Sequence, residues 1–197
     1  MFTFHQATPD DAEQISRIVV TSNAGLAEQL LDGLIPGLGS VAILTAAFIK
    51  GEGPYGTDNV ICSRDGERLT SMLFAYPSSE HRVPALLESL IPAKRLAPVR
   101  AILERSVPDS LYISSLWLEE SLRGKGHAPA LLLEAESLCR AKGFDRISLF
   151  CWNDNDTGMG FWARHGFSIA EHLDRETIPV QGHDKGGSIL CKTIGNA

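Results

Sequence analysis

Residues 111–142 join a strand-like run to a helical pattern through a glycine-rich turn, and this arrangement is the strongest constraint on the fold. The run LYISSLWL at 111–118 is typical of a strand. Glycines in such a turn let the backbone approach a ligand closely and aim several N–H groups at one point, and the helix adds the positive end of its dipole. The turn is therefore a candidate phosphate site, with close packing as the alternative reason for its glycines. It reads Arg123-Gly124-Lys125-Gly126-His127-Ala128, and the helical positions after it are Leu131, Leu132, Ala135, Leu138 and Cys139.

Two common phosphate loops are excluded by the residues themselves. The chain has no Gly-x-x-x-x-Gly-Lys-Ser/Thr sequence, so it has no P-loop. It also lacks a Gly-x-Gly-x-x-Gly sequence opening a βαβ unit, so no dinucleotide fingerprint is present.

Length and composition predict one domain over residues 1–197, with 44% apolar residues for its core. The longest apolar run, residues 39–49, is too short to cross a membrane, and the N-terminus has no basic signal region. A net charge of −6 argues against a nucleic-acid partner. We therefore expect a cytoplasmic protein that binds neither membranes nor nucleic acid.

The four cysteines favour reduced thiols rather than a metal site. Cys62, Cys139, Cys151 and Cys191 lie far apart, without a Cys-x-x-Cys pair or a histidine at zinc-ligand spacing. No metal ion is expected.

The remaining pattern predicts alternating strands and helices. Strands are expected at 2–7, at 60–63 and 69–76 around the Asp65-Gly66 turn, at 146–151, at 167–170 and at 188–192. Helices are expected from Thr8, over 24–32, within 34–56, in two short pieces between 83 and 106, over 129–142 and over 157–165. This order predicts a mixed α/β fold with a mostly antiparallel sheet and helices on both faces.

Two sequence blocks resemble the GNAT superfamily of N-acetyltransferases. The first is Arg-x-x-Gly-x-Gly/Ala, here Arg123, Gly126 and Ala128, which is similar to the family's pyrophosphate loop. The second is SLFCWNDNDTGMGFWARHGF at 148–167, which is similar to the strand, Asn and helix that close its acyl-CoA site. The resemblance implies a GNAT-like twisted central sheet and acetyl-CoA as co-substrate. In that reading, the backbone of Arg123, Gly124, Lys125, Gly126, His127 and Ala128 binds pyrophosphate, and the strand residues Leu116, Trp117 and Leu118 line the pantetheine arm.

Asn155 matches the Asn that contacts the cofactor arm in the family, although it also suits a helix cap. Seven residues later the family often has a tyrosine that protonates the departing thiolate, and this chain has Trp162. An indole is no acid at neutral pH. Solvent, another tyrosine (Tyr76 or Tyr112), or an absence of turnover would each account for the substitution, and we favour solvent because a thiolate is already a fair leaving group.

The general base is not assigned by any motif. Glu119 and Glu120 follow the central strand, His81 follows the hairpin, and His165 and His172 lie near the closing block. Each of these residue types in such a position is more often a surface residue than a base.

The resemblance implies transfer of acetyl from acetyl-CoA to a primary amine by direct attack in a ternary complex. The acceptor amine is expected to belong to a small molecule or a peptide. The sequence does not assign an oligomeric state, and a homodimer is one of the alternatives. A non-catalytic acyl-CoA sensor and an acetyltransferase acting on protein N-termini or lysines are the rival functions. Gly126→Arg is predicted to abolish CoA binding while leaving the fold intact.

Overall fold

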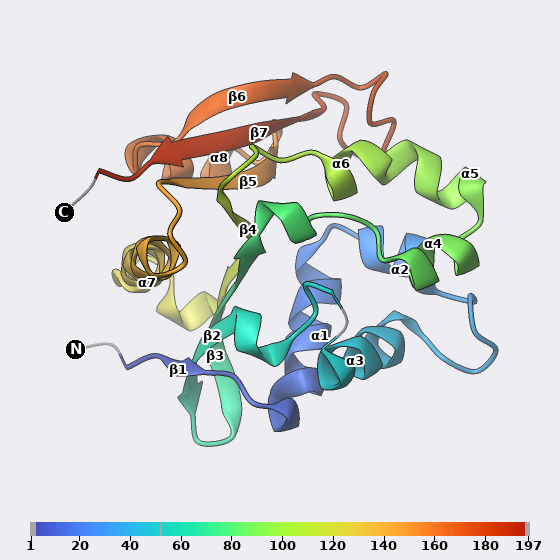
Figure 1. The fold of residues 1–197 in the computed structure, drawn as a ribbon, viewed down its shortest axis with the longest axis horizontal. Coiled ribbons are helices and arrows are strands. Elements are labelled where there is room, and N and C mark those ends of the chain that lie inside the picture. The colour runs from blue at the N-terminus through green and yellow to red at the C-terminus, as the bar shows by residue number, and fades with distance from the viewer. Residues whose placement is uncertain (1–2, 52, 196–197) are drawn as a thin grey trace. The chain divides into compact units, whose positions relative to one another are not determined.

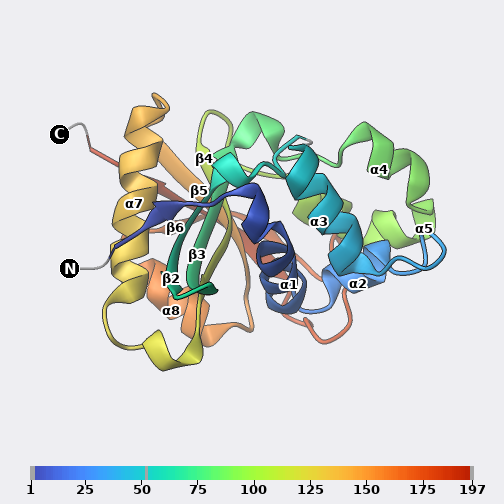
Figure 2. The same ribbon diagram turned by 90° about the horizontal axis from the view of Figure 1, so that it is seen from below.

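The computed structural model describes residues 3–51 and 53–195, and its strands form one mostly antiparallel sheet flanked by helices (Figures 1 and 2). In this described part, the strands follow the order β1-β2-β3-β4-β5-β7-β6. The pairs β1–β2, β2–β3, β5–β7 and β6–β7 are antiparallel, whereas β4 and β5 are parallel. The strands are β1 (His5–Gln6), β2 (Val60–Asp65), β3 (Arg68–Pro77), β4 (Leu111–Leu118), β5 (Arg146–Trp152), β6 (Ser168–Leu173) and β7 (Gly187–Thr193).

The helices are mostly short. They are α1 (Ala12–Ser22), α2 (Leu26–Leu31), α3 (Ser40–Lys50), α4 (Ala85–Leu90), α5 (Ala93–Leu96), α6 (Arg100–Glu104), α7 (His127–Ala141) and α8 (Asp156–Arg164). Single 3-10 turns lie at Pro9–Asp11, Thr57–Asn59, Ser78–Glu80, Ala97–Val99 and Glu120–Leu122. The chain divides into two compact units: residues 1–75, 84–92 and 115–132 form the first, and residues 76–83, 93–114 and 133–197 form the second.

In the first unit, α1 and α3 lie side by side (Figure 2). The amphipathic pattern of α1 buries Ile15 completely, and α3 turns Leu44 and Phe48 inward, at 3% and 1% exposure. Phe48 meets Phe74 of β3 edge-on, with ring centroids 5.3 Å apart. The apolar run 41–49 therefore forms a helix that packs one face on the core, while Ile49 stays 59% exposed.

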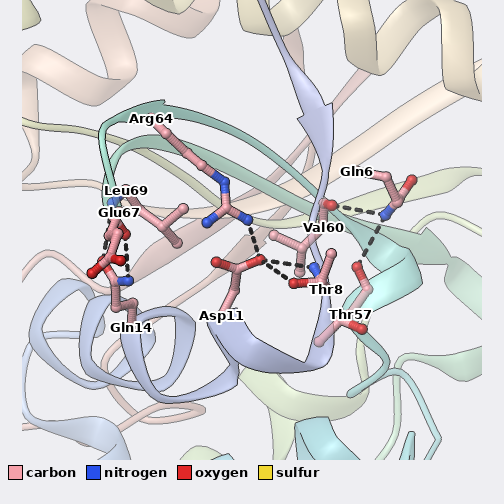
Figure 3. A network of polar contacts seen from close by, with 9 residues as sticks. All are labelled: Gln6, Thr8, Asp11, Gln14, Thr57, Val60, Arg64, Glu67 and Leu69. Carbon is pink, nitrogen blue, oxygen red and sulfur yellow. Dashed lines mark hydrogen bonds and ion pairs between the residues drawn. The ribbon is translucent and has the colours of Figure 1, made fainter.

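A polar network ties the start of α1 to β1 and β2 (Figure 3). Asp11, only 1% exposed, accepts hydrogen bonds from the Thr8 N–H (2.8 Å) and hydroxyl (3.0 Å) and forms an ion pair with Arg64. Burial alone would raise the pKa of Asp11, but the bonds from Thr8 and Arg64 outweigh it and lower that pKa below its usual value. Gln14 extends the network by bonding the backbone of Glu67 and Leu69.

In the second unit, β5, β7 and β6 run side by side, and a long loop joins β6 to β7 (Figure 1). The buried faces of β5 and β7 contribute to the core, with Ile147, Leu149 and Ile189 each at most 2% exposed. Helix α7 ends as its sequence predicts, because Gly143 adopts φ +80° and its N–H bonds the carbonyl of Arg140.

The fold class is confirmed, together with the strand at 111–118, the hairpin and the helices α3, α7 and α8. Several of the predicted elements differ from the structure. The strand predicted at 2–7 is shorter in the structure, where β1 covers only His5–Gln6. Residue 2 lies outside the described residues. The helix predicted over 24–32 begins at Leu26, because Ala24 and Gly25 adopt φ of +50° and +80°. Residues 83–106 form three short helices instead of the two predicted.

Candidate active site

The glycine-rich turn lies in the first unit and leads from β4 into α7. Gly124 and Gly126 adopt φ of +71° and +84°, which L-residues with a side chain rarely do, so the glycines are required by the backbone path. The first turn of α7 is closed by the N–H of Ala130 bonding the carbonyl of Gly126 at 3.2 Å. Amides in a first turn lack intrahelical acceptors. Residues 123–126 are exposed, so an anion has access to this end of the helix.

The second half of β4 leaves the β5 ladder before it reaches this turn. The pairing joins Leu111, Tyr112 and Ile113 to Ile147, Ser148 and Leu149, although β4 continues to Leu118. Leu116, Trp117 and Leu118 are all half-buried, so the expected alternation between an inner and an outer face is absent here. Backbone N–H and C=O groups on a strand edge can bond an extended ligand.

The two glutamates after β4 differ in their surroundings. Glu119 forms an ion pair with Arg68, Oε1 to Nη1 at 2.6 Å, and its N–H bonds the carbonyl of Thr70. Glu120 is exposed and begins a 3-10 turn. The Glu119 carboxylate is therefore already engaged, which weakens the case for it as a base.

Tyr76, His81 and Tyr112 form a buried cluster in the second unit. His81 Nε2 donates to the carbonyl of Ile102 at 3.0 Å, since a carbonyl can only accept, and Nδ1 then accepts from the Tyr76 hydroxyl at 3.2 Å. The His81 ring stacks on Tyr112 with centroids 3.7 Å apart. Burial lowers the pKa of His81 to about 4, and the bond to Ile102 offsets only part of this effect. His81 is therefore a neutral structural residue at physiological pH.

Asn155 lies in the turn between β5 and α8, in the second unit. Its Oδ1 accepts from the Gly158 N–H at 2.9 Å, so the side chain caps α8. A Cβ on Gly158 would lie 2.6 Å from Asn155 Nδ2, which explains the glycine at this position. Further along α8, Trp162 is 9% exposed and packs against Phe161 and Phe167, with centroids 4.9 and 5.0 Å away.

The same turn carries a pair that the sequence pattern did not indicate. His183, from the loop between β6 and β7, lies with Nδ1 3.0 Å from both carboxylate oxygens of Asp154. Its ring is stacked on Trp152, the last residue of β5. The two other candidate histidines use Nδ1 elsewhere: His165 bonds the carbonyl of Phe161, and His172 bonds the hydroxyl of Ser188.

The cysteines are free thiols, three of them buried. Burial raises the pKa of Cys139 and of Cys151 to about 11, so neither is a ready thiolate at neutral pH. Within residues 3–51 and 53–195, no three His, Cys, Asp or Glu side chains are grouped as metal ligands require. The helices in this part of the chain all fall short of the length and apolarity needed to cross a bilayer.

The comparisons with known proteins agree on one class, the acetyltransferase fold. The chain is similar to a crystal structure of an acetyltransferase, with 18% identity over 98% of this chain and 100% of that one and a TM-score of 0.70. It is similar to an N-acetyltransferase from Staphylococcus aureus Mu50 (17% identity, 96% and 99% covered, TM-score 0.66). It is also similar to Arabidopsis thaliana Naa50 in complex with the bisubstrate analogue CoA-Ac-MVNAL (13% identity, 98% of each chain covered, TM-score 0.55). A search of curated protein sequences found no match.

A sequence model of a protein family matches part of the chain. Residues 95–167 match the model of the acetyltransferase (GNAT) family, and this range contains the glycine-rich turn, Asn155 and Trp162. Over these residues the chain is similar to the acetyltransferase (GNAT) family, and the solved structures show the acetyltransferase fold over nearly the whole chain.

Proposed function

We propose that this protein transfers the acetyl group of acetyl-CoA to a primary amine in a ternary complex, as a cytoplasmic enzyme. The observation that carries the proposal is the exposed turn of residues 123–126, where two glycines with positive φ lead into the first turn of α7. Backbone amides at such a helix end suit a pyrophosphate. The free thiols also suit a reducing compartment.

In this proposal, the amides of residues 124–128 hold the pyrophosphate, because the Arg123 N–H already bonds the carbonyl of Glu120 at 3.1 Å. The edge of β4 at Leu116, Trp117 and Leu118 binds the pantetheine arm. An amide of Leu116 or Leu118 polarises the thioester carbonyl and bonds the oxyanion as it forms. Asn155 caps α8 through Oδ1, which leaves its Nδ2 to donate to the arm.

The chemistry is an addition followed by an elimination. The amine nitrogen attacks the thioester carbonyl carbon, the carbon–sulfur bond breaks, and sulfur leaves with the electron pair and takes up a proton. The raised pKa values of Cys139 and Cys151 support direct attack by the amine instead of an acyl-cysteine intermediate. Trp162 cannot supply the proton for sulfur, and solvent is sufficient because a free thiol has a pKa near 8.5.

The cofactor site is tested by two matched arginine substitutions. Gly126→Arg and Gly143→Arg each place a side chain at a similar φ, +84° and +80°, so each should lower stability by about 1 kcal/mol and the melting temperature by about 2–4 °C. Gly143 lies at the far end of α7, where an added Cβ meets no atom within 4 Å. Calorimetry should show CoA affinity lowered at least tenfold by Gly126→Arg alone. Equal CoA affinity in both variants would contradict the placement of the pyrophosphate.

The acceptor class is tested with acetyl-CoA and a panel containing a polyamine, an amino-acid amide and peptides with a free N-terminus or lysine. Released CoA is measured by chromatography and the acetylated product by mass spectrometry. Product with one class identifies the acceptor. CoA binding without any product or hydrolysis would favour the acyl-CoA sensor instead.

A further inference from the structure

The end of β5 and the loop between β6 and β7 bring a carboxylate, an imidazole and an indole together in the second unit. The His183 ring lies nearly parallel to the Trp152 indole, with centroids 3.8 Å apart and planes 6° apart. Its Nδ1 is 3.0 Å from both Oδ1 and Oδ2 of Asp154. A carboxylate can only accept, so Nδ1 carries the proton and Nε2 carries the lone pair.

Both partners are held in place by the backbone around them. Asn153 accepts a bond from Ser188, and its Nδ2 donates to the carbonyl of Lys185 at 2.8 Å. The Asn153 N–H also bonds the carbonyl of Gly186, while the Gly186 N–H bonds the carbonyl of His183 at 3.0 Å. The loop that carries His183 is therefore fastened to the turn that carries Asp154, which fixes the imidazole before any ligand arrives.

The Nε2 atom distinguishes His183 from a structural histidine. His81 uses both ring nitrogens and is buried. His183 has 17% of its side chain exposed, and no residue in the described part of the chain hydrogen-bonds to its Nε2. A lone pair on an oriented, partly accessible imidazole is what proton abstraction requires. The indole face beneath the ring also stabilises the cation that forms when Nε2 takes up a proton.

We propose that His183, oriented by Asp154, is the general base for the acetyl transfer proposed above, on which this inference rests. Asp154 immediately precedes Asn155, to which that proposal gives a contact with the cofactor arm. An acceptor amine is mostly protonated at neutral pH, and Nε2 removes the proton that blocks its lone pair. The amine then attacks the thioester carbon, the second proton leaves the nitrogen as the thiolate departs and becomes a thiol, and His183 returns its proton to solvent.

Asp154 is a positioning residue in this scheme, and Asp154→Asn tests it without a change of size. The Asn amide can donate to Nδ1, which favours the tautomer with the proton on Nε2 and removes the base. We expect His183→Ala and Asp154→Asn each to lower kcat about 100-fold with the best amine of the panel, while the CoA dissociation constant changes less than threefold. Added imidazole should restore part of the rate of His183→Ala and none of that of Asp154→Asn.

His172→Gln is the matched control, because His172 is exposed and bonds Ser188 through Nδ1 without a carboxylate partner. It should keep kcat within about twofold. If His183→Ala or Asp154→Asn transfers acetyl at the wild-type rate, the role of the Asp154–His183 pair is overturned and the proposed function stands. A loss of kcat confined to His172→Gln would assign the base to His172. No transfer by the wild type with any amine would overturn the proposed function and the dyad together. Circular dichroism and CoA binding establish that each variant is folded.

Discussion

The burial of His81 predicts a measurable dependence of stability on pH. Its pKa falls from 6.5 to about 4 in the folded chain because burial disfavours the charged ring. Between these two pH values, the unfolded chain binds a proton at this residue and the folded chain does not. The free energy of unfolding therefore falls as pH drops through this window, by about 3 kcal/mol in total, and the contribution of this histidine vanishes above it.

The substitution that isolates this effect is His81→Gln, which keeps a donor and an acceptor but does not titrate. At pH 7.5 we expect the variant to be about 1–2 kcal/mol less stable than the wild type, since it loses the stacking on Tyr112. Lowering the pH to 4.5 should shift the difference by about 2.5 kcal/mol in favour of the variant. Urea unfolding followed by tryptophan fluorescence at both pH values measures the difference directly.

His5→Gln is the control, because His5 is exposed on β1 and its removal leaves His81 in place. The wild-type response to pH should persist in it. A constant difference between His81→Gln and the wild type across this range would refute the reasoning, since it would mean that His81 takes up its proton equally well in both states. It would also return His81 to the candidates for a base.

Three further predictions concern the frame of the site. Asp11→Asn should lower stability by about 2–3 kcal/mol above pH 5, because the bonds from Thr8 and Arg64 depend on the charge of the carboxylate. This loss should become smaller as pH falls through the lowered pKa of Asp11. An equal loss of stability at pH 2.5, measured by urea unfolding, would contradict this prediction. Gly158→Ala should cost about 1–2 kcal/mol in a thermal or urea melt by displacing the Asn155 cap, and unchanged stability would mean that the cap is dispensable. Trp162→Phe should leave kcat within about threefold, and a larger drop in kcat, with CoA affinity unchanged, would give the indole a direct role in transfer.

The strand and the helix next to the glycine-rich turn could be predicted because the apolar spacing in their sequences matches the burial of those residues in the fold. β4 occupies the predicted residues 111–118, and α7 follows the glycines with Leu131 and Ala135 fully buried. By contrast, β6 has five exposed residues in succession at 168–172, so it shows no alternation and its length was underestimated. Residues 83–106 were also hard to divide, since prolines at 84, 92 and 98 interrupt them and contacts decide which short turns become helical.

The turn and Asn155 could be located from sequence because their residues lie close together in a motif. The pair of Asp154 and His183 could not, since 29 residues separate them and the loop around His183 is rich in glycine and charged residues. The ladder between β5 and β7 brings the two together by placing Trp152 opposite Gly187. The one available signal was a histidine in the loop between β6 and β7, and this loop lies at the end of β5 in the fold.

Two ring-stacked histidines of the second unit, His81 and His183, show why residue type alone does not assign a base. His81 and His183 both stack on an aromatic ring and both have Nδ1 engaged. In His81, Nδ1 bonds a neutral hydroxyl and Nε2 donates to a carbonyl, so protonation of the ring would bury an uncompensated charge. In His183 the partner is a carboxylate, which compensates the charge gained when Nε2 accepts a proton. The same side chain is thus confined to the core in one place and suited to proton transfer in the other, and the substitutions at these two positions should separate a loss of stability from a loss of kcat.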